Sequence, residues 1–235
     1  MGNQTLVIGL GQLGMSFARA MSEQGSEVIA VDVDPLRVHE VASAVAEAVE
    51  LNATDADALA RLSPHERDVC LCAVGDENRE ASIIITALLK QLNAPHIIAR
   101  AINPIHARIL RLVGAHEVIN PEQSYGERLA LRLMWRGALN ILPLGGGLVL
   151  TELVAPEGML GRTLAELELP RRFSVTVAAL RERGAPAAPG EALSPAAAAQ
   201  LPARLPEPHR PLQRGDVLLL VGAEPHTRLL VERFQ

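Results

Sequence analysis

Three glycines near the start of the chain have a spacing that is typical of turns that hold phosphate groups. They follow an apolar segment at residues 5–8, in the run Gly9-Leu10-Gly11-Gln12-Leu13-Gly14. The first glycine permits a tight turn, the second lets the backbone approach a phosphate, and the third lets a helix pack closely on the preceding strand. The N-terminus of that helix presents N–H groups to an anion. The motif therefore predicts a nucleotide-binding turn, and a merely tight strand-to-helix turn is the alternative.

An acidic residue stands where a nucleotide site needs one for the ribose. Asp32 ends the apolar run at residues 28–31 and follows Gly14 by 18 residues, close to the roughly 20 residues expected for the carboxylate that binds ribose hydroxyls. This carboxylate would repel the extra phosphate of NADP, so we expect a nucleotide with a free ribose diol. The alternative for Asp32 is a solvated strand end. Asp34, which precedes Pro35, is better explained as a helix cap than as a second ligand.

Catalytic chemistry is not indicated. The histidines are scattered, at positions 39, 65, 96, 106, 116, 209 and 226. The sequence contains no serine-centred nucleophile elbow, Walker lysine loop or kinase signature. We therefore expect a binding protein and not an enzyme. The rival hypothesis is a soluble NAD-dependent oxidoreductase, which would need an acid or base beside the nicotinamide.

Short apolar runs and longer amphipathic segments alternate regularly between residues 5 and 119, and the strands and helices that they predict must position this site. Apolar runs predict six strands, at residues 5–8, 28–31, 48–51, 69–74, 97–99 and 118–119. Helices are expected between them, including one from Asn78 to Leu92 and one from Asn103 to Leu112. This pattern predicts an α/β fold, a Rossmann-like doubly wound parallel sheet. Cys70 and Cys72 lie in one of the apolar runs and are interpreted as buried structural thiols.

The second half of the chain differs in composition. Residues 124–139 have apolar positions at helical spacing and predict a connecting helix that packs on its own domain or on a second subunit. The run 143–147 contains three glycines and indicates a domain boundary. Beyond it, strands at 148–154, 175–180 and 217–221 and short helices at 163–167 and 225–234 predict a small α+β domain. Residues 184–209 are expected to form a long loop with a helical turn at 195–201. The expected domains are 1–140 and 141–235.

Charge and hydropathy exclude some partners. The formal net charge of the 235 residues is −5, so no basic field is available to hold a nucleic acid polymer. No apolar run reaches the roughly 20 residues that span a bilayer. We therefore expect a cytosolic protein.

The order of motifs is specific enough to indicate a family. The first set is Val7-Ile8-Gly9-Leu10-Gly11-Gln12-Leu13-Gly14, Val31-Asp32-Val33-Asp34, Asn52-Ala53-Thr54, Ala73-Val74-Gly75-Asp76-Glu77-Asn78, Ile98-Ala99-Arg100-Ala101, Gly114-Ala115 and Asn120-Pro121-Glu122. The second set is the segments 160–167 and 215–222. With these motifs the chain resembles, over nearly its whole length, the KtrA/TrkA family of RCK (regulator of conductance of potassium) proteins. One N-terminal and one C-terminal RCK domain make it similar to the short KtrA-type subunit.

The resemblance implies a regulatory function. Members of this family are cytoplasmic gating subunits at the inner face of the cell membrane. They dimerise through the helix that follows the Rossmann strands, and they assemble into an octameric ring. The ring binds an integral-membrane potassium-translocating subunit of the KtrB/TrkH type. The resemblance also implies control by an adenine nucleotide, which is ADP, ATP or NAD(H).

The resemblance further assigns site residues. Those expected to surround the nucleotide are Gly9, Leu10, Gly11, Gln12, Leu13, Gly14, Asp32, Val33, Asp34, Asn52, Ala53, Thr54, Ala73, Val74, Gly75 and Asn78, with Arg100 near the phosphates. Glu122 matches an acidic position that approaches a divalent cation, Mg²⁺ or Ca²⁺, at the dimer interface, and a helix-start residue is its alternative. Gln12 departs from the family pattern, because relatives that discriminate ATP from ADP often have an arginine there.

A third hypothesis concerns the C-terminal domain. It could bind a different ligand, such as an acidic metabolite or a cyclic dinucleotide, at a dimer interface. Arg162, Arg171 and Arg172 could serve an anion there. A solvated surface is the simpler interpretation of these arginines.

Overall fold

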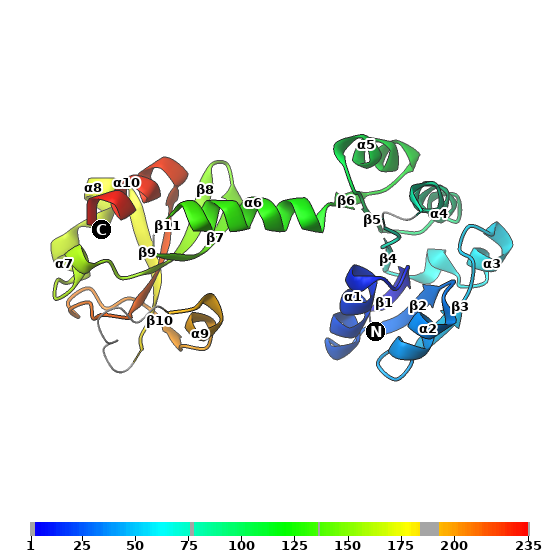
Figure 1. Cartoon of the computed structure of the whole chain (residues 1–235), viewed down its shortest axis with the longest axis horizontal. Coiled ribbons are helices and arrows are strands. Elements are labelled where there is room, and N and C mark those ends of the chain that lie inside the picture. Colours follow the sequence, from blue (N-terminus) through cyan, green and yellow to red (C-terminus); the bar gives the residue numbers. More distant parts are fainter. Residues whose placement is uncertain (1–2, 76–77, 136, 184–192, 235) are drawn as a thin grey trace. The chain divides into compact units, whose positions relative to one another are not determined.

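The chain forms two compact units in a computed structural model, Met1–Pro121 and Glu122–Gln235 (Figure 1). The structure describes residues 3–75, 78–135, 137–183 and 193–234. Each unit is described by itself below.

The first unit is built on a six-stranded sheet in which all strands are parallel. Its order is β3-β2-β1-β4-β5-β6, so the chain starts at the centre, winds to one edge and then crosses to the other side. The crossing places a topological switch between β1 and β4, where ligands of such folds bind. The strands are β1 (Gln4–Ile8), β2 (Glu27–Asp32), β3 (Glu47–Glu50), β4 (Val69–Cys72), β5 (Ile97–Arg100) and β6 (Glu117–Ile119). The predicted doubly wound sheet is confirmed.

Helices cover both faces of this sheet. Alternate residues of β1 point to opposite faces: Leu6 packs in one cluster with Leu89 and Leu110, whereas Val7 packs in another with Ala18. The first face therefore meets α4 and α5, and the second meets α1 (Figure 1). The helices are α1 (Gln12–Glu23), α2 (Pro35–Val41), α3 (Ala56–Ala60), α4 (Arg79–Gln91) and α5 (Pro104–Val113), with the short 3₁₀ helix η1 (Pro64–Glu66).

Three of these helices begin at the side-chain caps that the sequence indicates. Asp34, Asn78 and Asn103 each accept a hydrogen bond from a backbone N–H in the first turn of the helix that follows, at 2.8–3.1 Å. Such caps satisfy N–H groups that have no partner within the helix. They fix where α2, α4 and α5 start and so confirm the predicted starts of these helices.

The second unit is α+β. Its sheet is antiparallel, in the order β10-β9-β11-β8-β7. The strands are β7 (Ala138–Gly145), β8 (Leu148–Val154), β9 (Val175–Arg181), β10 (Ala203–Arg204) and β11 (Val217–Ala223). The helices are α6 (Pro121–Met134), η2 (Glu157–Met159), α7 (Leu164–Leu167), α8 (Leu169–Phe173), α9 (Pro195–Ala199) and α10 (Glu224–Phe234). The predicted small α+β domain is confirmed, and α9 provides the expected helical turn.

The glycine run at 145–147 forms the turn of the β7–β8 hairpin and not a linker. All three glycines have positive φ angles, between +60° and +88°, which residues with a side chain rarely adopt. Because β7 begins at Ala138, the connecting helix is shorter than predicted and ends at Met134. The compact units divide near Pro121 because Trp135, just after α6, packs in the core of the second unit. The domain boundary between 140 and 141 stays a prediction, and residues 184–192 of the expected loop lie outside the described residues.

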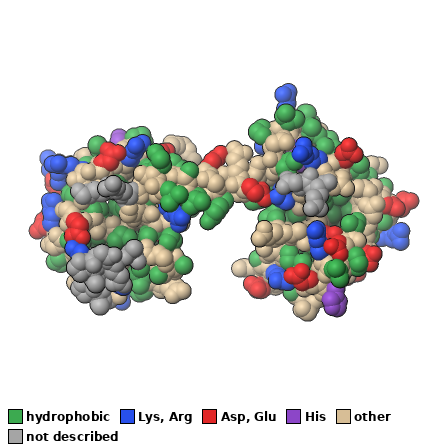
Figure 2. Space-filling model, in the orientation of Figure 1, with side chains coloured by type: hydrophobic (Ala, Val, Ile, Leu, Met, Phe, Trp, Pro, Cys, Tyr) green, Lys and Arg blue, Asp and Glu red, His purple; other side chains and the backbone are tan. Residues whose placement is uncertain are grey.

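Charged side chains show no separation by sign on the visible face of the molecule. Figure 2 shows acidic and basic groups interspersed over both units. Among the described residues, no helix is both long enough and apolar enough to cross a bilayer.

A buried polar pair joins α4 to α5. Ser82 Oγ lies 2.9 Å from His106 Nε2, and the two residues are 0% and 3% exposed. Burial and the nearby positive charge of Arg79 lower the pKa of His106. The imidazole is therefore neutral in the folded protein at neutral pH.

Acidification should destabilise the first unit through His106. An unfolded histidine takes up a proton near pH 6.5, whereas burial opposes protonation of His106 in the folded state. The unfolded chain therefore binds more protons below that pH, and stability present above about pH 6.5 is lost as the pH falls. We expect a lower urea midpoint at about pH 5.5 than at about pH 7.5. His106→Gln, which cannot titrate but retains an amide beside Ser82, should show a smaller difference. An equal pH dependence in both proteins would contradict this role of His106.

Candidate functional site

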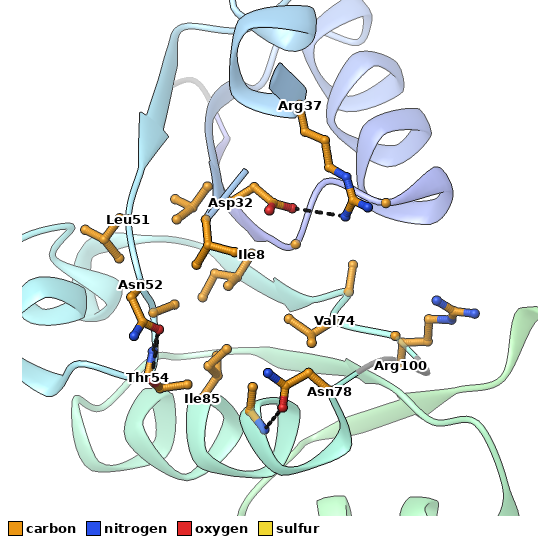
Figure 3. A pocket seen from close by; sticks show the side chains of 18 residues that line it. Ile8, Asp32, Arg37, Leu51, Asn52, Thr54, Val74, Asn78, Ile85 and Arg100 are labelled. Carbon is orange, nitrogen blue, oxygen red and sulfur yellow. Dashed lines mark hydrogen bonds and ion pairs between the residues drawn. The ribbon is translucent and has the colours of Figure 1, made fainter. Parts of the chain in front are cut away.

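A cavity of about 740 Å³ opens at the carboxyl ends of the strands of the first unit. Its walls come from the ends of β1, β2 and β5, from the segments after β3 and β4, and from the N-terminal parts of α2 and α4 (Figure 3). A volume of roughly 300–1,000 Å³ is usual for sites that bind small molecules and cofactors. The cavity lies at the topological switch of the sheet, where the fold itself favours a ligand.

Most of the residues expected at the nucleotide site line this cavity. They are Gly9, Gly11, Asp32, Val33, Asn52, Ala53, Thr54, Ala73, Val74, Gly75, Asn78 and Arg100. The fold thus brings together segments from five separate parts of the sequence. Their contact with a nucleotide stays a prediction.

Five of the expected residues do not line the cavity. Leu10 is buried at 2% exposure, and Leu13 packs against the same apolar cluster. Gly14 lies in the first turn of α1, Gln12 is exposed at the start of that helix, and Asp34 caps α2. These residues shape or flank the cavity without forming its wall.

The three glycines of the turn meet three different structural requirements. Gly9 has φ +93°, a conformation that favours glycine, and its N–H donates to the Val31 carbonyl at 2.8 Å. A Cβ on Gly14 would overlap the carbonyl oxygen of Gly9, whereas a Cβ on Gly11 would meet no atom within 4 Å. Gly14 is therefore required for packing. Gly11 instead leaves open space where the cavity meets the N-terminus of α1.

Asp32 holds two loops of the cavity together. Its Oδ2 accepts a hydrogen bond from the Leu10 N–H at 2.6 Å, and its Oδ1 accepts one from the Asp34 N–H at 2.9 Å. The side chain is 7% exposed. The carboxylate thus fixes the glycine turn against the β2–α2 connection, and each of its oxygens retains acceptor capacity for a ligand. Its contact with ribose hydroxyls stays a prediction.

Two asparagines form part of the opposite wall. Asn52 Oδ1 accepts hydrogen bonds from the N–H and hydroxyl groups of Thr54, at 3.1 and 2.8 Å. Asn78 Oδ1 accepts from the Ala81 N–H at 3.1 Å. In both side chains the amide oxygen accepts a hydrogen bond from a nearby backbone N–H and so stabilises the local backbone conformation (Figure 3).

Arg100 supplies positive charge to the cavity from the end of β5. A Cβ on Gly75 would lie 2.5 Å from Arg100 Nη1, so the absence of a side chain at Gly75 leaves room for the guanidinium. Asp32 and Arg100 lie on different sides of the cavity (Figure 3). This separation suits a ligand that carries hydroxyl groups on one side and phosphates on the other.

The structure adds six cavity residues that the sequence analysis missed. They are Ile8, Val31, Arg37, Leu51, Ala81 and Ile85. The apolar ones are strand ends and helix positions that face inward, and such side chains commonly contact a base or sugar. Arg37 is the charged addition. It lies three residues after the helix cap Asp34, in the first turn of α2. This spacing is the feature of the sequence from which its place near Asp32 could have been predicted.

The described wall of the cavity offers binding groups. Its ionisable side chains are Asp32, Arg37 and Arg100, and no histidine, cysteine, serine or lysine lines it among the described residues. In the described part of the chain, no group of three His, Cys, Asp or Glu residues is arranged to hold a metal ion. Glu122 lies in the exposed first turn of α6, and its role at a divalent cation stays a prediction.

Alanine at Gly14 should destabilise the protein, whereas alanine at Gly11 should leave its stability almost unchanged. Gly14→Ala forces a Cβ onto the Gly9 carbonyl, so we expect a loss of about 2 kcal/mol or more. Gly11→Ala adds a Cβ in open space at an ordinary φ of −67°, so its stability should stay within about 0.5 kcal/mol of the wild type. Chemical denaturation of both variants checks this. Similar losses in the two proteins would contradict the assigned packing.

Comparisons with known proteins show the family of this chain. Residues 5–121 match the model of the TrkA-N domain. The chain is 34% identical over 175 residues to the Ktr system potassium uptake protein C of Bacillus subtilis (strain 168). The aligned residues make up 74% of this chain and 79% of that protein. It is 34% identical over 174 residues to the Ktr system potassium uptake protein A of Vibrio alginolyticus, with the same two shares, 74% and 79%.

A solved structure shares the fold. The GsuK channel bound to NAD superposes with a TM-score of 0.66 and 18% sequence identity, over 100% of this chain and 39% of that chain. At this identity the likeness supports the fold alone. The identities with the Ktr proteins, over most of both chains, go further: the chain belongs to the KtrA/TrkA family of RCK proteins.

Proposed function

We propose that this chain is a regulatory subunit of a potassium uptake system, and that it gates a membrane partner in response to an adenine nucleotide. The observation that carries the proposal is the cavity, which combines a glycine turn, Asp32 and Arg100 in a chain related to Ktr potassium uptake proteins. The cavity offers contacts for ribose and phosphates, and its described wall offers no acid, base or nucleophile pair of the kind that catalysis requires. We therefore propose a binding function for this chain, in keeping with its relatives among the Ktr potassium uptake proteins.

The ligand of the cavity is ADP, ATP or NAD(H). The opening beside Gly11 admits phosphates to the N-terminus of α1, whose N–H groups and partial positive charge favour anions. A channel of the same fold has been solved with NAD bound, which supports a nucleotide as the class of ligand. Gln12, exposed at the first position of α1, offers an amide and no charge to a terminal phosphate, so it favours ADP or NAD(H) over ATP.

Gating requires that the nucleotide bind two states of the assembly with different affinities, because a ligand with equal affinity for both shifts neither. The partner is an integral-membrane potassium-translocating subunit of the KtrB/TrkH type. The chain thus works in the cytoplasm, at the inner face of the membrane, as homodimers that form an octameric ring.

Helix α6 provides the surface for dimerisation. None of its residues is buried, and Tyr125, Leu133 and Met134 are 62–73% exposed. Exposed apolar side chains gathered on one helix are typical of protein interfaces. A second copy of the chain would bury them. Glu122, in the first turn of the same helix, would then lie at the dimer interface, where a divalent cation could bind.

Potassium uptake tests the proposed function directly. In cells that lack other uptake systems and express the membrane subunit of a Ktr system, growth at low potassium should require this chain. Gly11→Ala should fold normally but reduce growth, because the added Cβ would block the approach of phosphates. In calorimetric titrations, Gln12→Arg should raise the affinity for ATP relative to ADP about tenfold through a charge-assisted hydrogen bond. Growth that is independent of the chain would overturn the proposal.

Charge on α6 should break the assembly. A Leu133→Glu and Met134→Glu double variant places two carboxylates in the buried face of the proposed dimer, where an unpaired charge is strongly unfavourable. We expect light scattering to show a lower mass, down to that of one chain, 25.1 kDa. Leu36→Glu, at a leucine that is 78% exposed on α2, is the matched control and should keep the assembly intact. An unchanged mass in the double variant would exclude α6 as the interface.

A further inference from the structure

Arg37 stands beside the carboxylate that is expected to bind the ribose. Its Nη1 lies 3.7 Å from Asp32 Oδ2, and its Nε lies 3.5 Å from Asp34 Oδ2. Figure 3 shows the side chain extending from α2 toward Asp32, at the rim of the cavity. The guanidinium is thus held by two carboxylates at the place where the ribose would bind.

The donors of Arg37 remain available to a ligand. Both ion pairs are longer than ordinary N–H···O hydrogen bonds, and the guanidinium forms no hydrogen bond to any described residue. The side chain is 45% exposed. A guanidinium carries five N–H donors in a planar fork, so the two carboxylates fix its position without using its donors.

Ribose recognition by Asp32 alone is incomplete. An ionised carboxylate only accepts hydrogen bonds, whereas each ribose hydroxyl both donates and accepts. A hydroxyl that donates to Asp32 therefore retains an oxygen that needs a donor in a site from which most water is excluded. The Arg37 guanidinium lies within 4 Å of the same carboxylate oxygen, so it can donate to a hydroxyl oxygen that is bound there.

We propose that Arg37 is a specificity-determining residue, which pairs with Asp32 to recognise the ribose diol and so selects ribonucleotides over 2′-deoxyribonucleotides. The proposal rests on the nucleotide-binding function proposed above. A site built to hydrogen-bond a hydroxyl rejects an analogue that lacks it, because the polar groups of the site are left unpaired. The acceptor comes from the end of β2 and the donor from the first turn of α2.

A phosphate on the ribose is the other group that an arginine at this place could bind. The charges oppose it, because Asp32 and Asp34 both lie within 4 Å of the one guanidinium and leave this edge of the cavity net negative. Asp32 is also nearly buried, so its charge is weakly screened. A hydroxyl suits the pair better than a second phosphate does.

Calorimetric titration of the full chain with ADP, 2′-deoxy-ADP and NADP⁺ tests the proposal. The wild type should bind ADP about tenfold more tightly than 2′-deoxy-ADP. In Arg37→Ala the affinity for ADP should fall about tenfold and that for 2′-deoxy-ADP less than about threefold, so that the preference falls to about threefold or less. Arg37→Lys should restore part of it. Arg108→Ala, at an exposed arginine of α5, is the matched control and should leave both affinities unchanged. Thermal denaturation checks that every variant is folded.

Three results would overturn the proposal. Equal weakening of ADP and 2′-deoxy-ADP in Arg37→Ala would show that Arg37 contributes charge or structure without reading the hydroxyl. A selective loss of NADP⁺ binding would assign Arg37 to a ribose phosphate instead. If the wild type bound none of the nucleotides, the nucleotide-binding function itself would fail, and the wild-type titration separates this result from the other two.

Discussion

The contact between the backbone of Gly14 and the carbonyl of Gly9 sets the geometry on which the rest of the first unit depends. It allows α1 to start directly at the end of β1, so the free N–H groups of the helix face the cavity instead of the solvent. Asp32 then fixes the same turn from the neighbouring strand, by accepting the Leu10 N–H. Two short-range constraints, one steric and one from the Asp32 carboxylate, thus turn backbone N–H groups toward the cavity. The side chains added around it decide which anion fits.

The first unit was predictable because its signals are local. Glycines 9, 11 and 14, the caps at Asp34, Asn78 and Asn103, and the short apolar runs act within a few residues, and right-handed crossovers then leave few arrangements of the sheet. The second unit was harder. Strand β7 alternates between buried and exposed residues only up to Leu142, and the four residues from Leu142 to Gly145 are all exposed, so its second half has no clear strand pattern. The three glycines at 145–147 are typical of either a linker or a hairpin, and only long-range pairing with β8 distinguishes the two.

The same limit applies to the site. The sequence analysis identified residues that match a motif. A motif does not indicate which side chains from other parts of the chain the fold brings next to it. Arg37 belongs to no motif, and its importance appears only when α2 places it above Asp32 (Figure 3). Conversely, Leu10, Leu13 and Gly14 lie within the motif and serve packing, because a turn needs residues that hold it as well as residues that face the ligand. The motifs thus identified the segments that form the cavity, and the structure shows which of their residues line it.

The two cysteines have a consequence for how the protein can respond to its surroundings. Cys70 and Cys72 are the only thiols in the chain, both are fully buried in β4, and burial raises their pKa values to about 12 and about 11. Oxidants react with exposed thiolates, and neither thiol offers one. The chain therefore has no thiol switch of its own. If the cavity holds NAD(H), as proposed, the oxidised and reduced forms of that dinucleotide give the chain a route to redox sensitivity that needs no thiol.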